Sequence, residues 1–306
     1  MSQISVILLN WNGWDDTIES LKSIEKARTK RFFLTSIVVD NNSQNDSVER
    51  IKKYVRNKKN IVFIQNSDNL GFAGGNNVGI RSALENGADY ICILNNDTIL
   101  PKNFFLDLLQ SFSEHENVGI ASPKMYFAPG YEFHKDRYKK NELGKVIWYA
   151  GGSLDWRNVY GSNHGVDEVD HGQFDKDTPT DFVSGACIFG KREVFEKVGL
   201  FDENYYLYLE DVDLSMRVKK AGYEVWYLAK PTLWHKVSQS SAIGSQLNDY
   251  FITRNRLIFG MKYASIRAKQ ALIRESIRFM LSGRKWQRKG AVDYYLRRFG
   301  KGTWKS

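Results

Sequence analysis

Residues 4–13 read ISVILLNWNG, an unbroken apolar and β-branched run that ends in a polar turn. Such a run is typical of a strand buried inside a parallel sheet. Asp15, Asp16 and Thr17 then predict the start of a helix that continues to about Ala27, because acidic side chains are favourable near a helix N-terminus. The chain is thus expected to begin with a strand, a short loop and a helix.

The same order repeats through about the first 120 residues. The further predicted elements are strands over 35–39, 61–65 and 90–94, a helix from Asp46 or Ser47 to about Arg56, and a helix over 76–85 after a glycine-rich turn over 69–75. Strands that alternate with helices at this spacing form a mostly parallel, doubly wound sheet. The predicted fold class is therefore α/β, with a mostly parallel mixed sheet flanked by helices.

After about residue 120 the alternation ends. Residues 126–178 are rich in Tyr, Gly, His and Asp and show little periodicity, which predicts a long excursion with short strands over 146–150 and 152–154. The elements expected beyond it are strands over 182–189 and 222–228 and helices over 191–198 and 211–221.

Composition limits the class of protein. With 306 residues, of which 42% are hydrophobic and 26% charged, the chain can bury a full core. Cys92 and Cys187 lie in apolar runs, which predicts buried free thiols in a reducing compartment. The N-terminal residues lack the features of a signal peptide, and no window approaches the roughly 18 apolar residues of a membrane span. We therefore expect a cytoplasmic protein.

Charge is concentrated at one end of the chain. Residues 254–306 hold 15 Lys and Arg but two acids, a net charge of +13, so the first 253 residues carry −4 of the overall +9. A basic tail beside an acidic body suits an anionic membrane surface or a nucleic acid, and a solvated helical face is the plainer alternative. Residues 265–283 have a helical period that suits an interfacial helix on a membrane or a helix packed on the body.

Polar groups follow three of the predicted strands. Asp40 comes directly after the second strand, where its carboxylate could bind a base or ribose, or simply form a turn. The glycines of Asn69–Gly79 do not follow the first strand in the spacing of a dinucleotide site, which disfavours a nicotinamide-dependent oxidoreductase. Asp97 ends the segment Asn95–Asp97 and could bind a hard divalent cation.

In order, the motifs NWNG, VDNNS, NLGFAGGNNVGI, LNND-T, SGA, FDENYYLYLEDVDLSMR and LWH resemble the family 2 glycosyltransferases. The pattern is most similar to the rhamnosyltransferase-like branch and spans about residues 3–240. The resemblance implies the GT-A fold, a nucleotide-diphosphate sugar as donor, a divalent cation (Mg²⁺ or Mn²⁺), and inversion at the anomeric carbon by direct displacement.

The resemblance also implies roles for individual residues. Asp97 and His235 would hold the metal, although Asn95 stands where the family often has an aspartate, so metal affinity would be modest. Ser184, Gly185 and Trp234 would lie at the acceptor. The residues expected to line the nucleotide-sugar site are Asn10, Asn12, Asp40, Asn42, Ser43, Asn69, Gly71, Phe72, Gly74, Asn76, Asn77, Asn95 and Asn96.

An inverting transfer needs a base that takes the proton of the acceptor hydroxyl. Asp211 is the residue that the resemblance favours for this role, Glu210 is the next candidate, and Asp213 would orient the motif. The plainer alternative is an acidic helix N-terminus, in which carboxylates are favourable for electrostatic reasons alone.

These inferences predict an inverting transferase that moves a sugar, rhamnose being one candidate, from a dTDP- or UDP-linked donor to a glycan or polyprenyl-linked acceptor in cell-surface glycan synthesis. Residues 1–253 would form the GT-A domain, with a nucleotide-binding half (1–120) and an acceptor half (121–253). Residues 254–306 would form a basic helical tail that docks on the anionic inner face of the cell membrane. A nucleic-acid-binding protein that uses this tail is the alternative from a different class.

Overall fold

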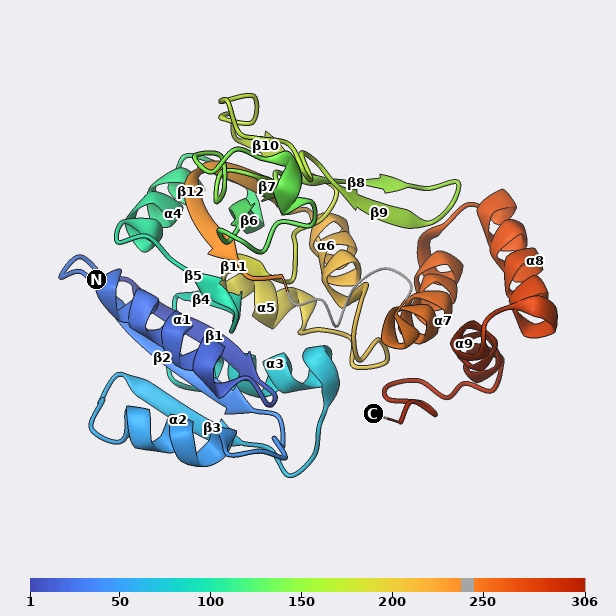
Figure 1. Cartoon of the computed structure of the whole chain (residues 1–306), viewed down its shortest axis with the longest axis horizontal. Helices are drawn as coiled ribbons and strands as arrows, with labels where there is room; N and C mark the ends of the chain where they lie inside the picture. The colour runs from blue at the N-terminus through green and yellow to red at the C-terminus, as the bar shows by residue number, and fades with distance from the viewer. Residues whose placement is uncertain (238–244, 306) are drawn as a thin grey trace.

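The computed structural model describes residues 1–237 and 245–305. Its core is a mixed sheet of ten strands (Figure 1). Eight of them follow the order β10-β12-β6-β11-β4-β1-β2-β3, and the other two, β5 and β7, pair with β12 and β6. Helices cover both faces of the sheet, so the predicted α/β class is confirmed. The N-terminal strands are β1 (Gln3–Asn10), β2 (Phe33–Asp40), β3 (Ile61–Gln65) and β4 (Tyr90–Asn95).

These four strands are parallel, and their register aligns their carboxyl ends. Asn10 pairs with Asp40 across β1 and β2, and Leu9 pairs with Asn95 across β1 and β4. Most apolar residues of β1, β2 and β4 are buried, as their continuous hydrophobic runs predict, whereas Phe33 and Val62 are exposed. The polar residues that end the strands therefore meet at one edge of the sheet.

The second half of the sheet mixes directions. The expected strand over 182–189 begins later, because residues 182–186 form a loop and β11 covers Cys187–Lys191. β11 is antiparallel to β4 and to β6 (Val118–Phe127), and β12 (Glu224–His235) is parallel to β6 and longer than the expected strand over 222–228. The end of β12 pairs with β5 (Thr98–Ile99).

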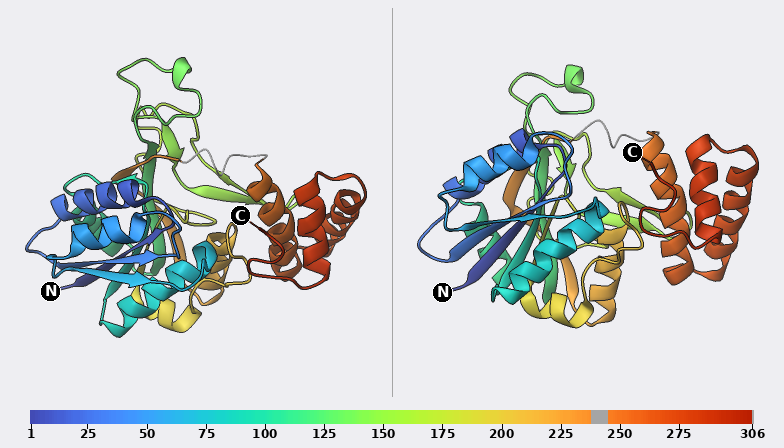
Figure 2. Two further views of the ribbon diagram at one scale, coloured as in Figure 1. Left: turned by 60° about the horizontal axis from the view of Figure 1, so that its bottom comes forward. Right: turned by 90° about the horizontal axis from the view of Figure 1, so that it is seen from below.

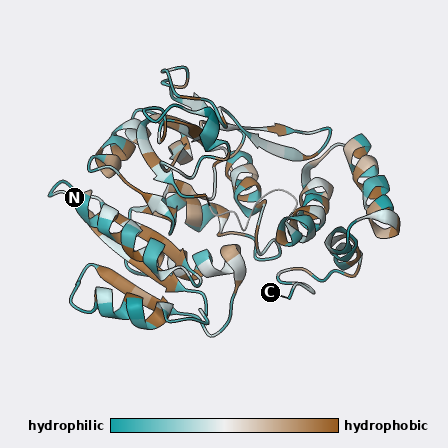
Figure 3. Cartoon of the chain, in the orientation of Figure 1, coloured by the Kyte–Doolittle hydropathy of each residue, from teal (hydrophilic) through white to brown (hydrophobic). Residues whose placement is uncertain are grey.

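Two helical layers enclose the sheet. One contains α1 (Trp14–Lys26), α2 (Ser47–Val55) and α4 (Phe104–Ser113), and the other contains α3 (Gly71–Glu85), α5 (Arg192–Val198) and α6 (Glu210–Lys220). Figure 3 shows apolar strands between helices that carry both polar and apolar residues. The helix predicted over 76–85 begins at Gly71 instead, so most of the expected glycine-rich turn is helical.

The irregular middle of the chain lies over the far half of the sheet. Its elements are the 3-10 helix η1 (Lys135–Arg137) and the short strands β7 (Ile147–Tyr149), β8 (Gly152–Asp155), β9 (Tyr160–Asn163) and β10 (Thr178–Pro179). β8 and β9 form a separate antiparallel hairpin that extends toward the C-terminal helices (Figure 1). Cys92 and Cys187 are buried and free, as predicted.

Three helices end the chain and pack together beside the sheet (Figure 2). They are α7 (Gln246–Tyr263), α8 (Ile266–Ser282) and α9 (Lys285–Tyr295). Ser245 and Ser265 cap α7 and α8, since their side chains accept hydrogen bonds from the backbone N–H groups of Asn248 and Ala268. The boundary expected at residue 253 falls inside α7. Among the described residues, no helix has the length and apolar content to cross a bilayer.

Candidate active site

The carboxyl ends of β1 and β2 are joined by a buried polar network. Asn10 donates from Nδ2 to Asp40 Oδ2 (2.7 Å) and to Ser43 Oγ (3.1 Å). Ser43 in turn donates to both carboxylate oxygens of Asp40, through its backbone N (3.0 Å) and its hydroxyl (2.7 Å). Asp40 and Asn10 are fully buried, so the network holds the two loops in register and forms the floor of the site.

Two asparagines with left-handed backbone lie above this floor. Asn12 has φ 59° and Asn42 has φ 62°, a conformation that asparagine tolerates better than most residues. Asn12 accepts from the backbone N of Gln44 (2.8 Å), and its own backbone N donates to Ser43 Oγ (2.8 Å). Asn12 is exposed and Asn42 half-buried, so both remain accessible to a ligand.

Asn41, which the sequence analysis did not select, joins this edge to the start of α3. Its Nδ2 donates to Asn69 Oδ1 (2.9 Å) and Gly71 O (3.0 Å), and its Oδ1 accepts from Leu70 N (3.0 Å). The residue lies between two selected positions in the VDNNS motif. The sequence did not indicate these contacts, because the partners of Asn41 lie 28 to 30 residues away and come close to it only in the folded chain.

The glycines of α3 permit close packing between the helix and its neighbours. Gly71 has φ +71°, and an added Cβ would lie 2.5 Å from the ring of Tyr206. A Cβ on Gly75 would lie 2.5 Å from Leu9 of β1. For Gly74 the nearest atom to an added Cβ is that of Leu70, at 2.9 Å. Gly71 and Gly74 thus adjoin protein side chains, and the approach to a nucleotide expected of them stays a prediction.

The other residues of α3 that were predicted to line the nucleotide-sugar site are mainly buried. Asn77 donates to Phe201 O (2.9 Å) and Glu203 Oε1 (2.9 Å) and accepts from Phe201 N (3.0 Å), so it connects α3 to the segment before α6. Asn76 is fully buried, and its Oδ1 has no hydrogen-bond partner within the described parts of the chain. Phe72 is half-buried and packs near Phe201.

Asp97 and His235 meet because β5 pairs with the end of β12. Asp97 Oδ1 lies 3.0 Å from His235 Nε2, and the amide of Asn95 lies 3.4 Å from the same nitrogen. Burial raises the pKa of the Asp97 carboxyl, but the His235 ring and Lys236 outweigh burial and hold that pKa below its usual value. The pair combines a carboxylate oxygen with an imidazole nitrogen at the polar edge of the sheet.

This donor set fits a divalent cation that is shared with a phosphate-bearing ligand. His235 Nδ1 is buried without a hydrogen-bond partner in residues 1–237 and 245–305. Within those residues, no group of three or more His, Cys, Asp or Glu side chains is arranged to hold a metal ion. Mg²⁺ is commonly bound by one or two protein carboxylates together with phosphate oxygens and water, which matches a site with few protein ligands.

Asp211 lies at the first turn of α6, against the loop that precedes β11. Its Oδ2 accepts from the backbone N of Gly185 (2.8 Å), and its Oδ1 accepts from the backbone N of Val212 (2.8 Å). Burial raises the pKa of the Asp211 carboxyl, and the backbone N–H donors offset that rise only in part. Burial together with the neighbouring Asp211 charge raises the pKa of Glu210 well above its usual value. Of the two, Asp211 is the carboxyl group that accepts hydrogen bonds from the backbone N–H groups of Gly185 and Val212.

Hydrogen bonds connect the surroundings of the Asp97–His235 pair to Asp211. The backbone N of Asn95 donates to Ala186 O (2.9 Å), in the loop that contains Gly185. Asn96 Nδ2 donates to Thr17 Oγ1 (2.9 Å), which donates to Asn10 Oδ1 (2.9 Å). The residues predicted to be functional on β1, β2, β4, β12 and α6 are thus linked by one hydrogen-bonded network.

The three residues expected at the acceptor occupy different environments. A Cβ added to Gly185 would lie 3.3 Å from Asp211 Oδ2 and from the Phe72 ring, so this glycine adjoins the carboxylate. Ser184 is buried and its backbone N donates to Ser122 Oγ (3.0 Å). Trp234 donates from its indole nitrogen to Gly144 O (2.9 Å) and thereby holds the loop before β7.

A clamp from α7, formed by Arg254 and Asn255, holds the segment that precedes Asp211. Asn255 Nδ2 lies within 2.8–2.9 Å of the carbonyl oxygens of Tyr205, Leu207 and Tyr208. Arg254, which is fully buried, donates to the carbonyls of Asn204 (3.2 Å) and Tyr205 (3.0 Å), and to Gly300 O (2.6 Å). Neither residue was predicted to be functional from the sequence, because there they begin a basic tail.

Asp213 anchors α6 to α7. Its Oδ2 lies 2.7 Å from Arg217 Nε, and its Oδ1 lies 2.7 Å from Lys262 Nζ and 2.9 Å from the Tyr263 hydroxyl. The carboxylate is fully buried. Burial raises the pKa of Asp213, but its bonds to Lys262 and Arg217 outweigh burial and leave that pKa below its usual value.

The lowered pKa of Asp213 predicts how its contribution to the free energy of unfolding changes with pH. Because the folded pKa of Asp213 lies below the unfolded value of about 3.9, its ion pairs stabilise the fold above about pH 4 and lose effect as the pH falls below it. We expect Asp213→Asn to lower the free energy of unfolding by about 3 kcal/mol at pH 7 and by progressively less toward pH 3. Urea unfolding across this range measures the difference, with exposed Asp136→Asn as control. A deficit that is constant with pH would contradict the assignment.

The chain matches the family model described as glycosyl transferase family 2 over residues 5–199. A hexosyltransferase of low-salt glycan biosynthesis, Agl10 of Haloferax volcanii, is 24% identical over 72% of this chain and 62% of its own length. The N-acetylglucosaminyl-diphospho-decaprenol L-rhamnosyltransferase of Mycobacterium tuberculosis is 23% identical over 67% of this chain and 68% of its own. The dTDP-rhamnosyl transferase RfbF of Shigella flexneri is 24% identical over 72% of this chain and 69% of its own.

The fold is likewise similar to that of a solved glycosyltransferase. The crystal structure of GalNAc-T7 with UDP, GalNAc and Mn²⁺ superposes with a TM-score of 0.61 at 14% identity, over 92% of this chain and 56% of that one. This likeness supports the predicted GT-A fold, and the named relatives support the rhamnosyltransferase-like resemblance. Because the family model covers well over half of the sequence, the chain belongs to glycosyl transferase family 2.

Proposed function

We propose that this chain is an inverting transferase that moves a sugar, with rhamnose the leading candidate, from a nucleotide-diphosphate donor to a hydroxyl of a lipid-linked or polysaccharide acceptor in cell-surface glycan synthesis. The observation that carries the proposal is the hydrogen-bonded connection between the Asp97–His235 pair and Asp211, through the Asn95–Ala186 backbone bond. Such a site offers a cation-binding edge for a diphosphate and a half-buried carboxylate near the transferred sugar.

In this reaction Asp211 acts as the general base. The acceptor oxygen forms a bond to the anomeric carbon, its proton passes to Asp211, and the bond from the anomeric carbon to the diphosphate oxygen breaks on the opposite face of the sugar. A divalent cation, when bound by Asp97 and His235, would neutralise the charge that develops on the leaving diphosphate. A raised pKa suits Asp211 for accepting a proton near neutral pH.

The donor is proposed to lie along the polar edge of the sheet, over the Asn10–Asp40–Ser43 floor. Asn12 and Asn42 are accessible there and could bind the base or ribose. A dTDP- or UDP-linked donor is favoured, since one relative is named for a dTDP sugar and one similar structure contains UDP. A polyprenyl-linked acceptor is suggested by the mycobacterial relative, and it would bring the enzyme to the inner face of the cell membrane.

Loss of the proposed base should affect turnover far more than binding. We expect Asp211→Asn to lower kcat by about 10²–10⁴-fold, because positioned proton transfer contributes that much. The single amide oxygen of asparagine can still accept from Gly185 N while the bond from Val212 N is lost, so the fold and the nucleotide affinity should be retained. Release of nucleotide diphosphate and titration with UDP or dTDP measure the two quantities, with Asp136→Asn as control. Turnover like that of the wild type would exclude Asp211 as the base.

Asn255 is proposed as a positioning residue that acts through the segment before Asp211. In Asn255→Ala three carbonyls lose their donor, and we expect kcat to fall about 100-fold while nucleotide affinity changes little, since a misplacement of about 1 Å can have such an effect. Asn255→Asp keeps the shape but removes the donor, so it should lose as much activity. Exposed Asn57→Ala is the matched control. Full activity in Asn255→Asp would contradict this role.

Cation and nucleotide binding should be coupled. We expect UDP or dTDP to raise the Tm of the wild type mainly when Mn²⁺ or Mg²⁺ is present, because a ligand that binds only the folded state stabilises it. Asp97→Asn should remove most of the cation-dependent part of that shift while the metal-free shift remains. Differential scanning fluorimetry with a nucleotide panel measures both. A response to NAD alone, or to an oligonucleotide alone, would instead favour an oxidoreductase or a nucleic-acid-binding protein.

A further inference from the structure

Helix α8 exposes a stripe of large apolar side chains. Ile266, Ile273, Ile277 and Leu281 are 75%, 38%, 45% and 74% exposed, and spacings of seven, four and four residues place them on one face of the helix. The opposite face is buried through Ala268, Leu272 and Ser276, and α8 packs on α7 and α9. In Figure 1 α8 lies at the outer edge of the molecule, on the far side of α7 from the sheet. This stripe therefore faces away from the catalytic domain.

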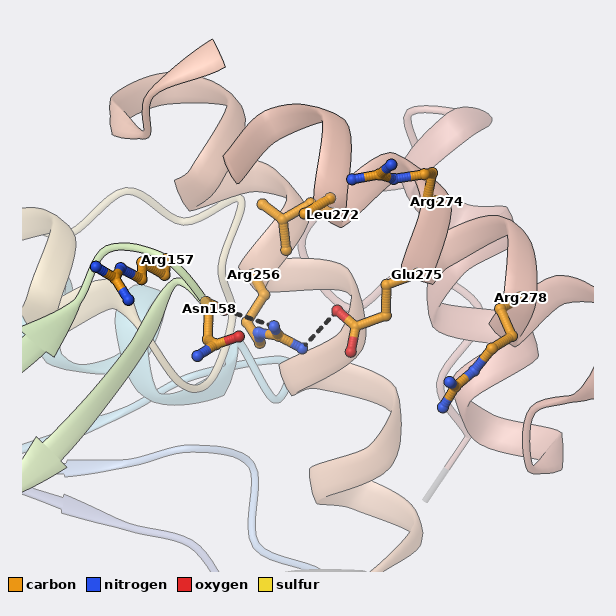
Figure 4. A pocket seen from close by; sticks show the side chains of 8 residues that line it. Arg157, Asn158, Arg256, Leu272, Arg274, Glu275 and Arg278 are labelled. Carbon is orange, nitrogen blue, oxygen red and sulfur yellow. Dashed lines mark hydrogen bonds and ion pairs between the residues drawn. The ribbon is translucent and has the colours of Figure 1, made fainter. Parts of the chain in front are cut away.

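Arginines border the stripe on one side. Arg267, Arg274 and Arg278 are exposed and follow one another along the adjoining face of α8. Arg274 and Arg278 also line a pocket of about 370 Å³ together with Arg157, from the turn between β8 and β9, and Arg256 of α7. Figure 4 shows these four side chains, which come from three separate elements.

Most of the positive charge at this pocket is uncompensated. Arg256 is the exception, since it pairs with Glu275 (3.0 Å) and donates to Asn158 O (2.6 Å). Within residues 1–237 and 245–305, the guanidinium groups of Arg157, Arg274 and Arg278 have no hydrogen-bond or ion-pair partner. Guanidinium groups bind phosphate in a bidentate manner, so an open pocket with three unpaired arginines suits a phosphate group.

We propose that the face of α8 formed by the apolar stripe and this arginine pocket docks on an anionic phospholipid membrane. The isoleucines and Leu281 would enter the headgroup region, and a lipid phosphate would occupy the pocket between Arg157, Arg274 and Arg278. This proposal deepens the proposed function, on which it rests, because a lipid-linked acceptor is met at a bilayer surface.

Two observations favour a membrane over another polyanion. A nucleic acid would satisfy the arginines but would leave Ile266 and Leu281 exposed, whereas a bilayer offers both phosphates and an apolar phase. The rest of the basic tail is partly engaged with the body, because Arg254 and Lys262 bind the segment before α6 and Asp213. The docking surface therefore consists of the exposed stripe of α8 and the adjoining arginine pocket. The other basic residues of the tail, such as Arg254 and Lys262, bind the body of the protein instead.

Vesicle binding of the full chain tests the proposal. We expect the wild type to co-sediment with vesicles that contain phosphatidylglycerol and to bind phosphatidylcholine vesicles far more weakly. Arg274→Gln combined with Arg278→Gln should weaken binding to the anionic vesicles about 10- to 30-fold, since each basic residue near such a surface contributes about fivefold. Lys53→Gln on α2, combined with Arg56→Gln directly after this helix, removes the same charge far from α8 and should bind like the wild type.

The apolar stripe has its own variant. Ile273→Ser combined with Ile277→Ser should weaken binding to both kinds of vesicle, and far-UV circular dichroism should show that helix content is unchanged. Equal losses in the α8 and α2 charge variants would overturn the proposal, as would tight oligonucleotide binding without vesicle binding. Donor hydrolysis by the wild type without vesicles separates the two hypotheses. If no donor is hydrolysed but vesicles bind as expected, the proposed function fails while the docking surface stands.

Discussion

The site depends on how α7 restrains the segment before α6. Tyr206, Tyr208 and Leu209 all have left-handed backbone, which costs roughly 1–2 kcal/mol per residue outside glycine. The carbonyl oxygens of this segment accept from Asn255 and Arg254, so the unusual conformation is held by donors that lie about 50 residues further along the chain. Glu210 and Asp211 follow at once. The direction in which Asp211 points is therefore set by a helix that is remote in sequence.

A second constraint arises from strand direction. The parallel strands β1, β2 and β4 bring their polar carboxyl ends to one edge, whereas β11 enters antiparallel next to β4 and carries the Gly185 loop to the same edge. The pairing of β5 with β12 then brings His235 to Asp97 from 138 residues away. Residues from both halves of the chain form one site because the sheet is mixed.

Three consecutive residues of α7 connect the active site to the proposed membrane surface. Arg254 and Asn255 bind the segment before Asp211, and Arg256 lies on the side that faces Glu275 of α8 and the β8–β9 turn. The same helix thus carries the clamp and part of the arginine pocket. Contact between α8 and a bilayer would fix the orientation of the segment before Asp211 relative to that surface, because α7 packs against α8 and holds this segment.

The α/β class, most elements of the first half and the polar positions at the strand ends could be predicted from the amino-acid sequence, because hydrophobic runs and turn residues are local signals. The sequence also indicated the family through its motifs. What those positions contact became known only from the folded chain. Asn77 connects α3 to the segment before α6, Asp213 connects α6 to α7, and Asn41 connects two loops. The glycines of α3 allow this helix to pack closely on Leu9 and Tyr206. The structure also shows that Arg254 and Asn255 bind the segment before Asp211 and that part of α8 is exposed. The sequence of the basic tail does not show which arginines are buried and which are exposed. An arginine can be buried only where carbonyl groups accept its hydrogen bonds, and those carbonyl groups come from distant parts of the folded chain.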